Sequence, residues 1–240
     1  MSALAGRPAP PWRVAAAWGV HLLTASSAPA GLFAIFATIR GDVPAAFLWM
    51  SYTVAVDASD GTLARAVRVK EVLPSVDGSR LDDVVDYFTW VVVPAFFVVQ
   101  VGLLPPGAAL PVVSLVLVAS GYGFSQTAAK TPDHFFTGFP SYWNVVAFYL
   151  YVLGWPPAWN AVVLVVLAVL VFVPIRYAYP SRMTELRAPT VLLGLAWGAA
   201  VLWAVFNFHT APRAVLTWSL LYPAYYIAVS FYLHAKRLSG

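Results

Sequence analysis

The chain has 240 residues, 61% of them hydrophobic and only 10% charged, with a mean hydropathy of +0.77, whereas soluble globular domains have roughly 25% charged residues; this composition predicts a membrane protein. It contains no cysteine, which excludes disulfides, thiolate nucleophiles and cysteine metal sites. In a membrane protein the distribution of Lys and Arg is more informative than the net charge of +4, so we infer no nucleic-acid binding.

Eight apolar segments follow one another along the chain, separated by Pro, Gly or charged clusters. They predict helices near residues 14–38, 44–66, 80–103, 109–128, 141–155, 157–177, 188–208 and 215–235. Most reach the roughly 20 residues that a membrane-spanning helix needs. The fifth is short and bounded by Pro140 and Gly154, so it is the weakest candidate for a full crossing. The fold expected is an all-α polytopic membrane protein with about eight transmembrane helices, forming one membrane-embedded domain over residues 1–240.

The basic residues are distributed unevenly between the loops. If the loops alternate across the membrane, only Arg40 and Arg213 lie on one side. The other side carries Arg7, Arg13, Arg65, Arg68, Lys70, Arg80, Lys130, Arg176, Arg182, Arg187, Lys236 and Arg237. By the positive-inside rule the basic side is cytoplasmic, so both termini are predicted to be inside.

A different interpretation of the N-terminus is a cleaved signal peptide. Arg7 and Arg13 precede an apolar run that reaches Ala28-Pro29-Ala30, a small-residue cleavage pattern. However, the apolar run continues to Ile39, which is longer than the core of a signal peptide, and its removal would upset the charge alternation. We therefore expect a membrane helix here.

Seven of the ten acidic residues lie between Asp57 and Asp86. This window reads Asp57-Ala-Ser-Asp60-Gly61-Thr-Leu-Ala64-Arg65 and, after a spacer, Gly78-Ser-Arg-Leu-Asp82-Asp83-Val-Val-Asp86. A carboxylate at membrane depth costs roughly 2.5 to 3.5 kcal/mol on insertion scales, so four at helical spacing need a partner, and a divalent cation is the expected one. The window is therefore the predicted active site.

Helical periodicity places the motif on two stripes. On the second helix the stripe contains Asp57, Asp60, Gly61 and Ala64, with Arg65 at its edge, and on the third helix it contains Gly78, Asp82 and Asp86. If the helices pack through these stripes, four carboxylates converge and the small residues leave room for a ligand. Hard oxygen ligands in that number suit Mg²⁺ or Mn²⁺, and a pair of such ions can promote displacement at phosphorus.

Other acidic residues and the histidines have simpler interpretations. We expect helix caps or solvated charges at Asp42, Asp77, Asp83, Asp133 and Glu185. Asp83 points about 100 degrees away from the stripe of Asp82 and Asp86, which favours a cap or surface role. The histidines His21, His134, His209 and His234 do not have the spacing of metal ligands.

With these residues the sequence resembles the CDP-alcohol phosphatidyltransferase family. The signature of that family is Asp-x-x-Asp-Gly-x-x-Ala-Arg, a spacer, then Gly-x-x-x-Asp-x-x-x-Asp, and every fixed position is present here. The spacer departs from the pattern, because residues 66–77 are more numerous than in the common form and include Pro74. Nucleotide contacts inside the spacer are therefore not transferred.

The resemblance implies the roles of the motif residues. Asp57, Asp60, Asp82 and Asp86 would hold one or two Mn²⁺ or Mg²⁺ ions that bind the pyrophosphate of a CDP-linked lipid, and Asp86 would be the general base on the acceptor hydroxyl. Further contacts with the CDP-lipid are implied for Gly61, Ala64, Arg65 and Gly78, and for Thr24 and Ser27 in the first helix. Relatives in the family are often dimers, so a homodimer is expected.

The acceptor alcohol has to be argued separately. An anionic acceptor needs a basic cluster in the pocket, but after Arg80 the basic residues lie at the ends of spans. A quaternary ammonium can instead be held by aromatic faces at about 0.5 to 2 kcal/mol per contact, and the spans are rich in Trp, Tyr and Phe. The whole chain is also similar to bacterial members of the family that use choline, in its length, its eight spans, its long spacer and its segment 133–144.

On this resemblance we expect choline as acceptor and CDP-diacylglycerol as donor. Candidates for the choline site are Tyr142, Trp143 and Asn144, together with Trp90 and Tyr87 close to Asp86. Trp and Tyr also gather at membrane interfaces without any ligand, which is the alternative for each of them. The active site is expected on the cytoplasmic side of a bacterial inner membrane, among membrane lipids.

Two other functions are kept open. The same enzyme class could transfer to serine, glycerol 3-phosphate or another alcohol. Alternatively, helices with buried carboxylates could form a cation-coupled transporter with an acidic ion relay. Transporters usually show an internal repeat and helices broken at mid-membrane, whereas these acids cluster once at a helix junction.

Overall fold

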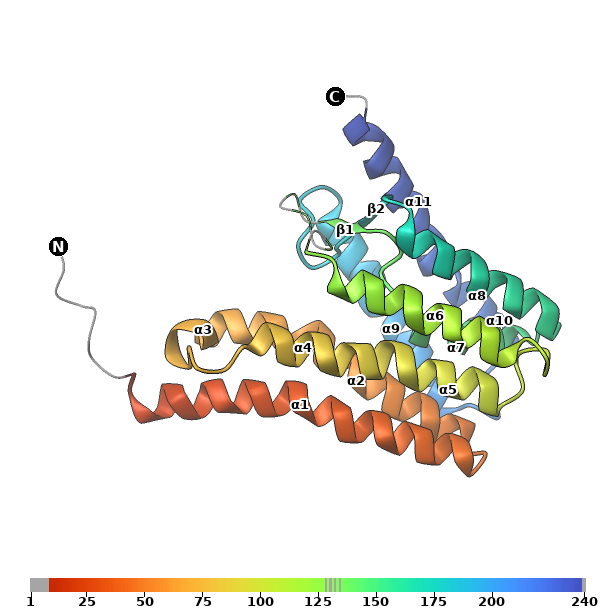
Figure 1. The fold of residues 1–240 in the computed structure, drawn as a ribbon, viewed down its shortest axis with the longest axis horizontal. Coiled ribbons are helices and arrows are strands. Elements are labelled where there is room, and N and C mark those ends of the chain that lie inside the picture. Colours follow the sequence, from red (N-terminus) through yellow and green to blue (C-terminus); the bar gives the residue numbers. More distant parts are fainter. Residues whose placement is uncertain (1–8, 128, 130, 132, 134, 239–240) are drawn as a thin grey trace.

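The computed structural model describes residues 9–127, 129, 131, 133 and 135–238. Arg7, Lys130 and His134 lie outside the described residues. The described part is helical apart from one short two-stranded ladder, which confirms the all-α class (Figure 1). Its elements are α1 (Pro11–Ile39), α2 (Val43–Val67), α3 (Val69–Val72), α4 (Gly78–Asp86), η1 (Tyr87–Val92), α5 (Val93–Gln100), α6 (Ala109–Ser125), β1 (Phe135–Thr137), α7 (Trp143–Leu153), α8 (Pro157–Phe172), β2 (Arg176–Ala178), α9 (Arg187–Phe206), α10 (Arg213–Ser219) and α11 (Leu221–Leu238).

Within the described residues, three helical segments are long and apolar enough to cross a membrane. They are Pro11–Ile39, Arg187–Phe206 and Arg213–Arg237, and α6, α7 and α8 are shorter apolar helices. The 11 residues of α7 would extend about 16 Å at 1.5 Å per residue, roughly half of a bilayer's hydrocarbon thickness. These helices support a membrane protein, and the number of eight crossings stays a prediction.

The third predicted helix is a continuous helical path with a wider turn in its middle. It begins at Gly78, where the Asp77 side chain accepts hydrogen bonds from the backbone N–H groups of Ser79 and Arg80, as expected for a cap. Residues Tyr87–Val92 form a π-helical stretch directly after Asp86, and helical backbone angles continue into α5. Such π-helical insertions are frequent at functional sites.

The spacer of the motif folds back onto α1. Arg68 ends α2 with a left-handed backbone (φ 57°), and the single turn of α3 follows. Val69 is buried against Ala17 and Val20 of α1. The spacer therefore packs against α1, and Figure 1 shows α4 running alongside α1.

The predicted helix over residues 157–177 is wrong at its C-terminal end. α8 stops at Phe172 and Val173 is extended, because the following Pro174 disfavours a helical backbone at the residue before it. Residues 176–178 instead form β2, which pairs antiparallel with β1. Two hydrogen bonds join the ladder to α11. The Tyr226 hydroxyl donates to the Ala178 carbonyl (2.9 Å), and the Ala178 N–H donates to Ser230 Oγ (3.0 Å).

Aromatic packing joins α2 to the helices behind it. Phe47 of α2 lies 4.8 Å from Phe97 of α5 and 5.1 Å from Phe148 of α7, measured between ring centroids. All three side chains are buried in the main core. These tilted and edge-to-face contacts are favourable geometries for aromatic pairs, and they fix α2 relative to the helix that carries Asp82 and Asp86.

Candidate active site

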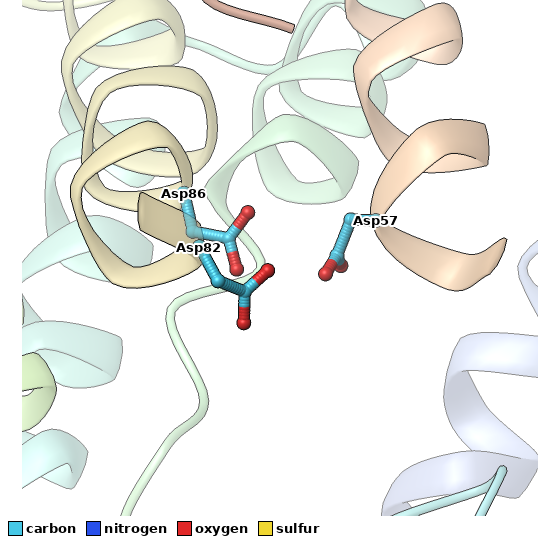
Figure 2. A group of neighbouring side chains, drawn as sticks. All are labelled: Asp57, Asp82 and Asp86. Atoms are coloured by element: carbon cyan, nitrogen blue, oxygen red, sulfur yellow. The ribbon is translucent and has the colours of Figure 1, made fainter. Parts of the chain in front are cut away.

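Three carboxylates of the motif converge between α2 and α4. Asp57 comes from α2, and Asp82 and Asp86 lie one turn apart on α4. One oxygen atom from each lies within 4.8 Å of the others, and all three residues are half-buried. Figure 2 shows Asp82 and Asp86 side by side and facing Asp57. The i, i+4 spacing places the two α4 carboxylates on one face, and packing brings Asp57 to meet them.

This donor set fits a divalent metal ion. Ionised carboxylates at such separations repel one another, and a cation among them removes the repulsion. Carboxylate oxygens are the hard ligands that Mg²⁺ and Mn²⁺ prefer. The cluster can therefore hold a metal ion.

Asp60 takes a different place from the other three motif carboxylates. It is buried, with 6% of its surface exposed, and its Oδ2 accepts a hydrogen bond of 2.6 Å from the Thr24 hydroxyl on α1. The cluster of Asp57, Asp82 and Asp86 does not include it. Thus α2 directs Asp57 toward α4 and Asp60 toward α1.

Of the acidic residues expected to be caps or solvated charges, Asp83 and Asp42 lie as predicted, whereas Asp133 is partly buried in ion pairs. Asp83 is exposed on α4, and Asp42 caps α2 by accepting from the Ala45 N–H (3.1 Å). Asp133 forms an ion pair with Arg176 (3.0 Å), and Glu185 forms one with Lys236. None of these four belongs to the three-carboxylate cluster.

Arg65 lies over the glycine of the motif. Its Nη2 donates to Thr62 Oγ1 (2.9 Å), and its Nη1 lies 3.3 Å from the position that a Cβ on Gly61 would occupy. The missing side chain at residue 61 therefore lets the guanidinium fold across the helix. Both residues are exposed, so this guanidinium is accessible to an anionic ligand.

The other small residues of the motif contact α1. A Cβ on Gly78 would lie 2.9 Å from Cε1 of His21, so the glycine makes room for this ring. Ala64 packs with Ala17 and Val20 of α1. Ser27 is buried on α1, and its hydroxyl has no hydrogen-bond partner among the described residues.

Two of the predicted acceptor-site aromatics lie together. The rings of Trp90 and Tyr142 are 5.5 Å apart, and Tyr142 meets Tyr226 of α11 edge-on at 5.8 Å. Sequence analysis did not identify Tyr226, because it lies far along the chain in a run of three tyrosines (Tyr222, Tyr225 and Tyr226) that is equally typical of a membrane interface.

The remaining predicted acceptor residues face other neighbours. The Tyr87 hydroxyl donates to the Leu117 carbonyl of α6 (3.1 Å), and Trp143 Nε1 donates to Ser120 Oγ of the same helix (2.8 Å). Asn144 is buried, and neither polar atom of its side chain has a hydrogen-bond partner within the described residues. Hydrogen bonds to α6 therefore orient Tyr87 and Trp143.

The helical fold and the paired acidic motif define a membrane-bound enzyme of the CDP-alcohol phosphatidyltransferase class. No protein-family model matches the chain. It is 41% identical to the phosphatidylcholine synthase of Legionella pneumophila over 224 residues, which cover 90% of this chain and 88% of that protein. It is 40% identical to the phosphatidylcholine synthase of Pseudomonas aeruginosa (78% and 79% covered) and 39% identical to that of Bradyrhizobium diazoefficiens (88% and 79% covered). The chain belongs to the family of bacterial phosphatidylcholine synthases.

Proposed function

We propose that the protein is an integral-membrane phosphatidyltransferase that condenses CDP-diacylglycerol with choline to give phosphatidylcholine and CMP. The observation that supports this most is the convergence of Asp57, Asp82 and Asp86 in a chain whose relatives are named phosphatidylcholine synthase. Residues 1–240 act in this proposal as one catalytic domain.

The motif binds the donor in this proposal. Asp57, Asp60, Asp82 and Asp86 would hold one or two Mn²⁺ or Mg²⁺ ions, whose positive charge would offset negative charge on the pyrophosphate and on the leaving CMP. Arg65, whose guanidinium lies over Gly61, binds a phosphate oxygen. Ala64 and Gly78 keep α1 close to the donor, with Thr24 and Ser27 on the same buried face of that helix.

Asp86 acts as the general base. It takes the proton of the choline hydroxyl while the choline oxygen bonds to the β-phosphorus and the bond from that phosphorus to the CMP oxygen breaks. Asp86 lies in the cluster with Asp57 and Asp82 and is the last carboxylate of the motif.

The acceptor ammonium lies against Trp90 and Tyr142. Trp90 follows Asp86 by four residues, so the ring begins about one helical turn from the base. That separation suits choline, whose hydroxyl is two carbons from its cationic nitrogen. Tyr226, which meets Tyr142, is a further candidate. Asn144, Tyr87 and Trp143 stay candidates of the proposal, and Tyr87 and Trp143 are held by hydrogen bonds to α6.

The proposed orientation places both termini and the active site on the cytoplasmic side of a bacterial inner membrane. Arg65, Arg68 and Arg80 flank the motif, in agreement with the positive-inside rule. About eight membrane-crossing helices and assembly as a homodimer complete the proposal.

A purified-enzyme assay tests the proposal. CDP-diacylglycerol is supplied with Mn²⁺ or Mg²⁺, and both CMP and the lipid product are measured with choline, serine and glycerol 3-phosphate in parallel. We expect choline-dependent phosphatidylcholine. Turnover with only another acceptor would support the role of the acidic motif and contradict the choline site. If no acceptor leads to CMP release, this would contradict the phosphatidyltransferase proposal and favour the transporter alternative.

A further inference from the structure

Thr24 of α1 lies against a carboxylate of the acidic motif. Its hydroxyl donates to Oδ2 of Asp60 across 2.6 Å. Both residues are buried, with 7% and 6% of their surfaces exposed. An O–H···O distance of this length lies at the short end of the range for hydroxyl donors.

The bond links a metal-motif residue to a helix outside the motif. Burying a carboxylate is costly unless hydrogen bonds compensate it, and the Thr24 hydroxyl supplies such a bond to Asp60. A carboxylate has about four acceptor positions on its two oxygens, so one bond at Oδ2 leaves others available to a cation. Thr24 therefore fixes the orientation of Asp60 and leaves other acceptor positions of the carboxylate free for a cation.

A buried threonine hydroxyl on α1 does not need a carboxylate as its hydrogen-bond acceptor, as Thr38 shows. Thr38 is equally buried, and its hydroxyl donates to the Ala34 carbonyl one turn back (2.8 Å). Threonines in helices commonly form this bond. The corresponding distance from Thr24 to the Val20 carbonyl is 3.3 Å, so the shorter contact of Thr24 is the one to Asp60.

We propose that Thr24 is a positioning residue that fixes the orientation of Asp60, the fourth carboxylate of the motif, for metal binding. The inference rests on the proposed function. It gives Thr24 a role different from the nucleotide contact expected from the sequence resemblance. Residues that hydrogen-bond to metal ligands typically change metal affinity by about 10- to 100-fold when they are mutated.

Mn²⁺ binding to the purified protein, without substrate, tests this role. Free Mn²⁺ is followed by its electron paramagnetic resonance signal for wild type, Thr24→Val, Thr24→Ser, Asp60→Asn and the Thr24→Val/Asp60→Asn double variant. We expect about tenfold or greater weakening in Thr24→Val, near-normal affinity in Thr24→Ser, and no further loss when Thr24→Val is added to Asp60→Asn. Thr38→Val is the matched control and should bind Mn²⁺ as wild type does.

Several outcomes would overturn the inference. Wild-type Mn²⁺ affinity in Thr24→Val would do so, as would equal losses in Thr24→Val and Thr38→Val, or losses that add up in the double variant. Unchanged Mn²⁺ affinity in Asp60→Asn would show that Asp60 is not a metal ligand and would overturn the inference. The choline assay on the wild-type enzyme tests phosphatidylcholine synthesis separately. If Thr24→Val does not fold, Thr24→Ala replaces it in every comparison.

Steady-state kinetics give a second readout. Because Asp60 acts on the donor in this proposal, Thr24→Val should raise the KM for CDP-diacylglycerol and leave the KM for choline unchanged, and Thr24→Ser should restore the former. A purely structural role would lower the amount of active enzyme and leave both KM values as in wild type, which would contradict the inference.

Discussion

The rings of Trp90 in η1 and Tyr142, directly before α7, have centroids 5.5 Å apart. A cation on an aromatic face gains about 0.5 to 2 kcal/mol, so replacing Trp90 by Leu should raise the KM for choline by roughly 2- to 30-fold. The KM for CDP-diacylglycerol should not change. Initial rates at varied choline measure this effect, and Trp159→Leu, at an exposed position of α8, is the control. An equal rise in both KM values would argue against an acceptor role for this ring.

Asp86→Asn should abolish transfer and retain binding of the CDP-lipid. An amide cannot take the proton of the acceptor, and general-base catalysis typically contributes about 10²- to 10⁴-fold to the rate. The measurements are kcat and the binding of CDP-diacylglycerol to the purified variant. Asp83→Asn, on the exposed side of the same helix, should keep normal kcat. Normal turnover in Asp86→Asn would remove the general-base assignment.

Removal of divalent cations should stop CMP release. The three converging carboxylates repel one another without a cation, and Mn²⁺ or Mg²⁺ added after chelation should restore activity. Asp57→Asn should require a higher Mn²⁺ concentration for half-maximal activity, because it removes one ligand. Full activity after complete removal of divalent cations would contradict a metal centre.

Gly138→Ala should strongly destabilise the fold. Gly138 has a φ of +79°, and an added Cβ would lie 2.2 Å from the carbonyl oxygen of Val171, a backbone atom that cannot easily move. Strain at such a backbone costs about 1 to 3 kcal/mol, and overpacking adds a similar amount. Thermal unfolding in detergent should show a clearly lower midpoint than for Gly107→Ala, where a Cβ would enter open space. Equal midpoints would contradict the packing of this turn against α8.

The ion pairs of Asp133 should make the ladder sensitive to pH. The hydrogen bond from Thr131 and the charges of Arg176 and Arg237 hold the pKa of Asp133 below its ordinary value. The stabilisation is therefore complete above the unfolded pKa of about 4 and is lost as the pH falls through the lower folded pKa. Asp133→Asn should cost up to about 1 kcal/mol at pH 7. The difference from wild type should shrink below about pH 4 in unfolding measurements, and a constant difference at all pH values would contradict the charge effect.

The sequence predicted the helices with different success along the chain. The first three predicted segments agree closely with α1, α2 and the path from Gly78 to Gln100, because their boundaries carry clear signals such as the capping residues Asp42 and Asp77. The C-terminal end of the sixth segment was wrong, since the apolar run continues past Phe172 to Ile175 and hydropathy alone reads it as helix. Pro174 was the local signal of the change, and pairing with β1 decided the outcome.

For the site, the sequence by itself predicted the acidic motif and determined that Asp82 and Asp86 share a face, because a spacing of four residues in a helix has only one geometry. It could not decide the separate places of Asp57 and Asp60, which lie about 60 degrees apart around α2 at 100 degrees per residue. Nor could it bring Tyr226 to Tyr142. Only the tertiary structure turned Asp57 toward α4 and Asp60 toward Thr24, because the rotation of a helix against its neighbours is set by the packing of the whole bundle and not by its own periodicity.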